Sequence, residues 1–234
     1  MSDFTDALRL YFDMLSVAKY NFEKLKNLGS KIACISAFHS GRNAKNATSD
    51  DAGGLDVVIF LAHGAAVMLA SNLWQEVGLC NGATGVVEDL LFNPDRTPPC
   101  QPIAALVHFT NYTGPAFITN PKTVPIPPHL FEWESDGQRL SRQQLPQRHP
   151  MTIHKSQGQT LPQVVVDLGK AEKAAGSSFV AISRVRSLQN LVLQPMSFQR
   201  LQAIGKSKQL QERLREEERL RNLAEVTTLH YEHL

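Results

Sequence analysis

The alternation of apolar and polar residues in the first third of the chain predicts one helix followed by strands. In residues 16–28 apolar side chains recur at helical spacing, and Gly29 follows as a stop. Residues 31–38 and 55–69 are short β-prone runs, which predict strands. Gly64 interrupts the second run and predicts a break or bulge there.

Two further segments lack this regular pattern. Residues 39–54 are rich in Ser, Asn, Asp and Gly, which predicts a loop. We interpret its Arg42 and Lys45 as solvated side chains, with phosphate contact as the alternative. Residues 86–145 are rich in proline, aromatic residues and short β-prone pieces. This composition disfavours helices and predicts a small β-barrel inserted into an α/β domain.

Apolar runs that suit an α/β fold return after Pro150. Residues 164–168 and 179–182 are near-continuous apolar runs, typical of buried parallel strands, with a helix expected between them. Residues 191–193 are a candidate for one more strand. Residues 209–225 carry leucines among many charges, which predicts a packed amphipathic helix with a solvated charged face.

Composition places the chain among ordinary globular proteins, with 42% hydrophobic and 20% charged residues in a length of 234. Its three cysteines are widely spaced, which predicts reduced, buried thiols. The net charge of +2 does not by itself indicate a polyanion partner, so evidence for nucleic-acid binding must come from a local site. No apolar run reaches membrane-spanning length, and the N-terminus is acidic, unlike a secretory signal. We therefore expect an intracellular location and no membrane partner.

The polar stretch at residues 152–161 is the strongest functional signal in the chain. Its sequence is T-I-H-K-S-Q-G-Q-T-L, and glycine in such a loop lets backbone N–H groups approach a phosphate chain closely. A strand-like run at 164–167, a helix and the apolar run at 179–182 are expected to follow. Ser183-Arg184 ends that run, so a strand, crossover and strand would carry a guanidinium at the far end.

Three weaker motifs do not predict a site. The run G-K-S at residues 205–207 imitates the end of a P-loop, but the required first glycine is an arginine here. Asp167 ends a strand-like run, and without a P-loop we interpret it as a cap or turn residue. The H-x-x-H at residues 230–233 has no partner ligands nearby in sequence, so no metal site is predicted.

Six stretches occur along the chain in a fixed order: G-A-A-V-M-L-x-x-N-L-W, G-L-C-N-G-A-T-G-V-V, V-P-I-P, S-R-Q-Q-L-P, T-I-H-K-S-Q-G-Q-T-L and F-V-A-I-S-R-V-R-S-L. Together they resemble the C-terminal half of Pif-type (petite integration frequency) helicases of superfamily 1B. The resemblance covers roughly residues 10–225 and is strongest over 64–188. It implies an α/β fold: a RecA-like lobe with a mainly parallel sheet and an inserted small Src-homology-like β-barrel. It also implies ATP-driven 5′-to-3′ unwinding of DNA, with roles in DNA repair, recombination and telomere maintenance.

The resemblance assigns a nucleotide site to three residues. Arg184 would be catalytic, as an arginine finger that reaches the γ-phosphate of ATP, with a surface ion pair at a strand end as the alternative. Gln157 and the backbone of Gly158 would lie near the nucleotide phosphates. The cofactor would be ATP with Mg²⁺, and most of its ligands would come from another lobe.

The same loop would supply contacts to single-stranded DNA. The resemblance assigns these contacts to Thr152, His154 and Lys155, with a structural histidine as the alternative for His154. We interpret Trp74 as a core aromatic rather than a base-stacking one. The Asn-Gly pair at residues 81–82 is interpreted as a structural turn that leads into the barrel.

By resemblance the chain divides into four parts: 1–85, the first part of the RecA-like lobe; 86–145, the barrel; 146–196, the remainder of the lobe; and 197–234, a C-terminal helical extension. The family's P-loop lobe, with its acidic metal-binding motif, has no counterpart in the sequence. We therefore expect this chain alone to be inactive and to need that lobe as a partner.

The strand that enters the polar loop departs from the family pattern. Residues 145–151 are shorter and more polar than in the family, and Pro150 cannot donate to a strand ladder. We expect this strand to be weak or to lie at an edge. Our preferred hypothesis is a C-terminal portion of a helicase acting in the nucleus, with the mitochondrion as the alternative. The competing hypothesis is a non-catalytic, helicase-derived nucleic-acid-binding protein or relic.

Overall fold

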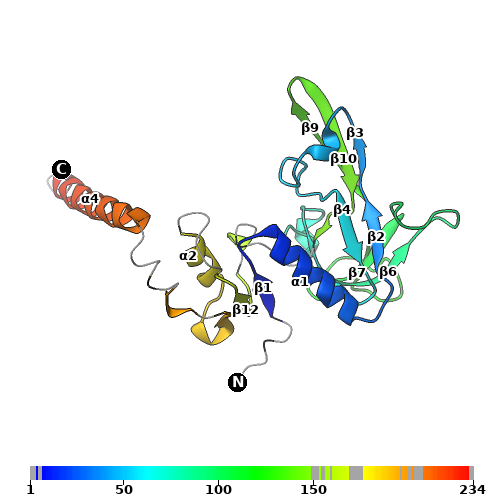
Figure 1. The fold of residues 1–234 in the computed structure, drawn as a ribbon, viewed down its shortest axis with the longest axis horizontal. Helices are drawn as coiled ribbons and strands as arrows, with labels where there is room; N and C mark the ends of the chain where they lie inside the picture. The colour runs from blue at the N-terminus through cyan, green and yellow to red at the C-terminus, as the bar shows by residue number, and fades with distance from the viewer. Residues whose placement is uncertain are drawn as a thin grey trace. The chain divides into compact units, whose positions relative to one another are not determined.

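In the computed structural model of the chain, the described residues are 4, 7–148, 153, 156–158, 160–168, 176–195, 197–199, 202 and 208–231. The chain divides into two compact units (Figure 1). The terminal unit consists of Met1–Met14 and Met151–Leu234, and the central unit of Leu15–Pro150.

The terminal unit contains a three-stranded parallel sheet. Its strands are β1 (Leu8–Leu10), β12 (Val164–Val166) and β13 (Leu191–Leu193), in the order β1-β12-β13. All three residues of β12, the central strand, are buried. Because successive side chains point to opposite faces of a sheet, both faces are covered at this strand. The strand predicted at 164–168 is confirmed over residues 164–166, and the one at 191–193 is confirmed over its whole length.

The strand predicted at residues 179–182 is wrong, because these residues form the helix α2 (Ser177–Ile182). A short apolar run fits either a strand or a helix, and burial decides between them. Ser177, Ser178 and Ala181 are buried, whereas Phe179 is 67% exposed. This spacing buries one face of a helix. The strand that completes the parallel sheet is β13 instead.

The C-terminal helix α4 (Lys208–Tyr231) is longer than predicted, and the predicted packing is not seen for residues 211–225. Every side chain from residue 211 to 225 is exposed, and Leu214, Leu220 and Leu223 in this stretch are about half exposed. Leu220 and Leu223 share a face of the helix, but Leu214 lies on the opposite side from Leu223, so the three leucines do not form one apolar stripe. The predicted solvated charged face is confirmed by ion pairs such as Arg219 to Glu216 at 2.7 Å. No helix in the described part of the chain is long and apolar enough to cross a bilayer.

The central unit is built from one helix and mainly antiparallel strands. In chain order its elements are α1 (Met14–Asn27), β2 (Ala33–Ser36), β3 (Phe38–Ser40), η1 (Ala44–Asn46), β4 (Val58–Leu61), β5 (Ala66–Leu69), η2 (Gln75–Val77), β6 (Thr84–Leu91), β7 (Ala104–His108), β8 (Thr123–Ile126), β9 (His129–Ser135), β10 (Gln138–Gln144) and β11 (Gln147–Arg148). The predicted first helix, its stop at Gly29 and the break at Gly64 are confirmed.

These strands form three open sheets with the orders β11-β5-β6-β7-β8, β3-β10-β9 and β2-β4. Among the described residues the strands do not close into a barrel, so the predicted Src-homology-like barrel is not confirmed. The strand β11 has two residues and lies at an edge, as predicted for the segment before Pro150.

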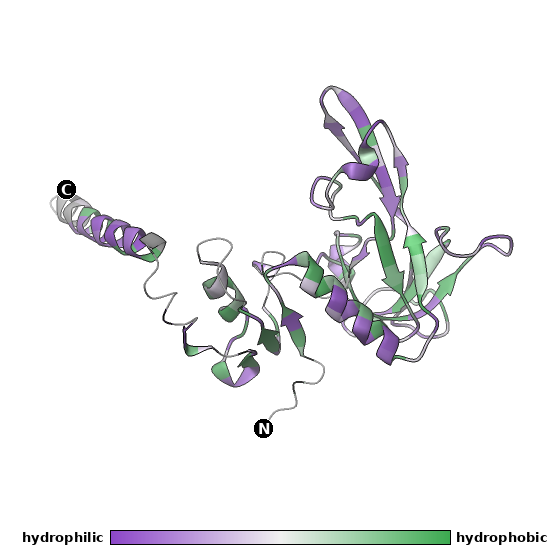
Figure 2. Ribbon diagram, viewed as in Figure 1, coloured by the Kyte–Doolittle hydropathy of each residue, from purple (hydrophilic) through white to green (hydrophobic). Residues whose placement is uncertain are grey.

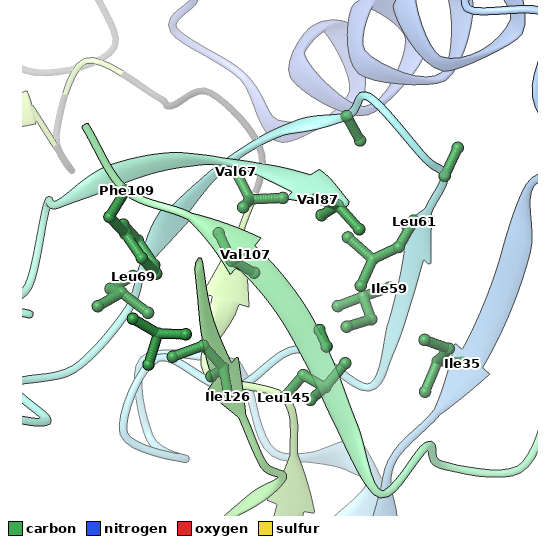
Figure 3. Packing of buried hydrophobic residues seen from close by; sticks show 14 of the residues in the cluster. Ile35, Ile59, Leu61, Val67, Leu69, Val87, Val107, Phe109, Ile126 and Leu145 are labelled. Atoms are coloured by element: carbon green, nitrogen blue, oxygen red, sulfur yellow. The ribbon is translucent and has the colours of Figure 1, made fainter. Parts of the chain in front are cut away.

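One apolar core joins the large sheet to the β2–β4 pair (Figure 3). Ile35 and Ile59 come from that pair, and Val67, Val87 and Val107 from three strands of the large sheet. This core thus includes residues from both sides of position 86. The predicted limits 1–85, 86–145, 146–196 and 197–234 stay a prediction.

Of the two interpretations made for the segment before β6, the one for Trp74 is wrong and the one for Asn81-Gly82 is confirmed. Trp74 is 40% exposed, so its interpretation as a core aromatic is wrong: it lies beyond the end of β5, on a turn closed by Leu79. The backbone N–H of Asn81 donates to Asn72 Oδ1 at 2.8 Å, and that of Gly82 donates to the carbonyl of Leu69 at 3.0 Å. These bonds confirm a structural turn.

The central unit buries an arginine completely. Arg142 on β10 lies under residues 41–57, here termed the covering loop, which connect β3 to β4. Its guanidinium donates to four carbonyl oxygens of that loop and to an imidazole: Leu55 O (2.8 Å), Ala47 O (2.7 Å), Ala44 O (3.0 Å), Thr48 O (3.4 Å) and His39 Nδ1 (3.4 Å). Figure 2 shows β9 and β10 as mostly hydrophilic, in contrast to the apolar β2 and β4. The hydrogen bonds of Arg142 therefore fix the covering loop to β10.

The contact between His39 and Arg142 predicts a pH dependence of stability. Burial, followed by the charges of Arg142 and Lys45, holds the pKa of His39 below its ordinary value of 6.5. The unfolded chain therefore binds more protons just below pH 6.5, and the central unit should lose stability as the pH falls through this range. Urea unfolding at pH 7.5 and 5.5 should show a smaller loss for His39→Gln than for the wild type.

The matched control is His129→Gln, which alters an exposed histidine on β9. It should retain the pH dependence of the wild type. If His39→Gln retains it as well, the protonation of His39 does not control stability.

Candidate functional site

The terminal unit brings the polar loop and the arginine stretch together. Arg184 follows α2, and its Nη1 donates to the carbonyl oxygen of Ser156 at 3.1 Å. The backbone N–H of Leu161 in turn donates to the carbonyl oxygen of Arg184 at 2.8 Å. Residues separated by more than twenty positions are thus joined by a side-chain bond and a backbone bond.

Two further bonds orient the guanidinium of Arg184. Its Nε donates to the carbonyl oxygen of Val180 at 2.7 Å, and its Nη2 donates to Ser183 Oγ at 2.9 Å. Together with Ser156 O, these acceptors are neutral oxygens, and the three bonds fix the direction of the group. The side chain is half-buried at the end of a helix, rather than at a strand end as predicted.

The polar loop is anchored below its exposed tip. Ile153 is buried, and its backbone N–H donates to the carbonyl oxygen of Tyr11 at 3.0 Å. Ser156 is fully buried, with its hydroxyl donating to the carbonyl oxygen of Ile153 at 2.7 Å. Gln157 and Gly158 follow directly and are exposed. The loop therefore presents these two residues to solvent beside the carbonyl that binds Arg184.

Gly158 has the backbone conformation expected of a loop that approaches a ligand. Its φ is +80°, and a Cβ at this position would meet open space. Glycine is thus required by the backbone and not by crowding. An exposed glycine loop beside a cation fits a phosphate chain. The described residues contain no group of three or more potential metal-ligating side chains, so they offer no complete site for Mg²⁺.

Thr152, His154 and Lys155 lie outside the described residues, and their predicted DNA contacts stay a prediction. The structure adds three partners that the sequence did not indicate: the carbonyl oxygens of Ser156 and Val180 and the hydroxyl of Ser183. Backbone acceptors have no side-chain signature, so a motif cannot reveal them.

Comparison with known proteins relates this arrangement to one family. A family model described as the 2B domain of the DNA helicase Pif1 matches residues 58–90. The human ATP-dependent DNA helicase PIF1 is 35% identical over 190 residues, which cover 79% of this chain and 26% of the human protein. The chain belongs to the Pif1 helicase family. It spans about a quarter of the length of the curated Pif1 relatives it matches.

Solved Pif1 structures share the fold. The crystal structure of Pif1 from Candida albicans superposes with a TM-score of 0.65 at 28% identity, covering 82% of this chain and 45% of that protein. Bacteroides Pif1 in complex with ADP-AlF3 and ssDNA gives a TM-score of 0.55 at 20% identity, covering 84% of this chain and 42% of that one. The α/β helicase fold is thus confirmed, and the chain corresponds to a C-terminal portion of a Pif1-type helicase.

Proposed function

We propose that this chain supplies an arginine finger and single-strand contacts to an ATP-dependent 5′-to-3′ DNA helicase. The observation that carries the proposal is the hydrogen bond from Arg184 to Ser156 O, which joins the guanidinium to the loop. The human and rat relatives are described as ATP-dependent DNA helicases, which supports the activity.

The proposed role of Arg184 follows from the chemistry of phosphoryl transfer. Charge spreads over the transferred γ-phosphoryl group in the transition state, and a positioned guanidinium stabilises it. The bonds to Val180 and Ser183 restrict the side chain, so less conformational freedom is lost when it binds phosphate. A P-loop lobe would bring the remaining phosphate ligands.

Gln157 and the backbone of Gly158 would bind the phosphates of ATP from this side. Mg²⁺, held by the P-loop lobe, would neutralise charge on the phosphates.

Thr152, His154 and Lys155 would contact the backbone of the single strand. A hydroxyl, an imidazole and an ammonium are groups that bind phosphate oxygens. Their place in the chain, beside the anchored Ser156, would couple the strand to the nucleotide site. A Bacteroides Pif1 that shares this fold has been crystallised with ssDNA, which supports a DNA partner.

Reconstitution tests the proposal. The full chain is combined with the P-loop lobe of a related Pif1 helicase, and ATP hydrolysis is measured with and without single-stranded DNA. DNA-stimulated hydrolysis should occur only when both parts are present. Salt-sensitive DNA binding without any gain in hydrolysis would contradict the catalytic role and favour a non-catalytic nucleic-acid-binding protein.

Lys155→Ala should weaken single-strand binding and reduce its salt dependence. Loss of one phosphate contact lowers the slope of log K against log salt by about 0.7 for single strands. Fluorescence anisotropy with a labelled oligothymidylate at several salt concentrations measures this slope. Lys45→Ala, which alters an exposed lysine of the covering loop, is the matched control and should leave the slope unchanged. An unchanged slope in Lys155→Ala would exclude this contact.

A further inference from the structure

The central unit contains a cleft whose lining, among the described residues, includes neither Arg184 nor the polar loop at residues 152–161. It has a volume of about 720 Å³ and lies between the covering loop and the tip of the β9–β10 hairpin. Its lining includes Arg42 and Asp51 from the loop and Trp133, Glu134 and Asp136 from the hairpin. A volume of this size accommodates a small ligand or a side chain with its flanking peptide.

Both walls of the cleft are held in place. Buried Arg142 binds carbonyl oxygens of the covering loop, as described above. Gly53 of this loop lies on the ring of Phe131, where a Cβ would come within 2.5 Å of the ring. The loop therefore covers the hairpin as far as Phe131 and is fixed there. A binding surface that is formed before its ligand arrives loses less entropy on binding.

Trp133 follows Phe131 by two residues on β9, closer to the tip of the hairpin, and it lines the cleft. Its ring stacks on that of Phe131, with centroids 6.3 Å apart and planes inclined by 25°. On β10 its partner is Leu140, which also lines the cleft. Trp133 thus offers a partly exposed indole, supported from behind, at the base of a preformed cleft.

The charges around the cleft are mainly negative. Three carboxylates, Asp51, Glu134 and Asp136, and one cation, Arg42, line the cleft. A hydrogen bond from the Thr48 hydroxyl, and a second from its backbone N–H, hold the pKa of Asp51 below its usual value, and the buried Arg142 also lowers it, so this carboxylate is ionised at neutral pH. Such a surface repels a phosphate backbone and attracts a cation.

We propose that this cleft binds an arginine or lysine side chain of a protein partner. The cation lies over the indole of Trp133, whose ring face attracts positive charge, and Asp51 and Asp136 provide the counter-charge. Glu134 adds to the negative potential at the rim. The open volume beside Trp133 holds the flanking peptide. This site is independent of the proposed helicase role of Arg184.

The test follows the indole N–H of Trp133 by NMR in the full chain. Trp74→Phe leaves Trp133 as the sole tryptophan, because the sequence has two. The probe is acetyl-Gly-Arg-Gly-amide, and the matched control is the same peptide with citrulline, which is isosteric and neutral. The arginine peptide should give a saturable shift of the indole signal, and the citrulline peptide should bind about tenfold more weakly.

Charge variants locate the contact. Asp136→Asn combined with Glu134→Gln should weaken the arginine peptide about tenfold, and asparagine preserves the positive φ of 52° at position 136. Glu132→Gln is the control: it removes one carboxylate from β9, and Glu132 pairs with Arg139 and does not line the cleft. It should leave binding unchanged. Unfolding curves establish that each variant is folded.

Three results would overturn the proposal. The first is the absence of an indole shift with the arginine peptide, and the second is equal binding of the citrulline peptide. The third is a saturable shift with oligothymidylate that becomes stronger in the Asp136→Asn, Glu134→Gln variant. That last outcome would make the cleft a nucleic-acid contact.

Discussion

Arg184→Ala is expected to lower DNA-stimulated ATP hydrolysis by about 10³-fold or more in the chain combined with a P-loop lobe. The variant removes the guanidinium that would stabilise charge on the transferred phosphoryl group. It also removes the bond to Ser156 O, which joins the helix end to the loop. Arg184→Lys should also be strongly impaired, because lysine cannot reproduce the planar fork that binds several oxygens at once. Steady-state hydrolysis with saturating single-stranded DNA measures both effects.

The matched control is Arg186→Ala, which removes an exposed arginine two residues further along the chain. It changes the net charge by the same amount but leaves the three bonds of Arg184 in place. We expect near wild-type hydrolysis. Equal activity of the two alanine variants would show that Arg184 is not the finger.

Arg142→Met is expected to destabilise the central unit by about 3 to 5 kcal/mol, because several buried acceptors each lose a hydrogen bond worth about 1 to 3 kcal/mol. Methionine fills part of the space of the arginine but donates no hydrogen bond. The carbonyl oxygens of Ala44, Ala47 and Leu55 then lose their partner beneath the covering loop, and each buried unpaired acceptor costs free energy. Urea unfolding of the full chain, followed by tryptophan fluorescence, measures the change. Both tryptophans belong to the central unit, so the signal reports on that unit.

Arg139→Met on the same strand is the control for Arg142→Met. Arg139 is exposed and forms only a surface ion pair with Glu132 at 2.6 Å. Such pairs contribute little, so we expect a change within about 0.5 kcal/mol. If the two methionine variants are equally stable, the covering loop does not depend on the buried arginine.

The sequence predicted two of the three parallel strands of the terminal unit, β12 and β13, but it missed β1 and assigned the segment before Arg184 to a strand instead of a helix. A run of four apolar residues carries too little periodicity to separate a strand from a helix. The two buried serines before it, Ser177 and Ser178, begin a helix that only the surrounding packing decides. The proximity of Arg184 to the polar loop does not depend on this difference.

The central unit shows where local signals suffice and where they do not. Asp136-Gly137 forms the turn between β9 and β10 with φ values of 52° and 70°, and an Asp-Gly pair favours this conformation, so the hairpin was open to prediction. The burial of Arg142 was not. Four of its five acceptors are backbone oxygens about 90 residues away in the chain, and only the folded structure brings them together.

The claim that this chain completes a nucleotide site is tested most directly by trapping the transition state. The full chain, a P-loop lobe from a related Pif1 helicase and single-stranded DNA are mixed with ADP and aluminium fluoride, and co-elution is measured by size exclusion. Wild type and Arg186→Ala should co-elute with the lobe more strongly with ADP–aluminium fluoride than with ADP alone, whereas Arg184→Ala should lose this gain. Equal co-elution of Arg184→Ala and wild type in the presence of ADP–aluminium fluoride would contradict the claim.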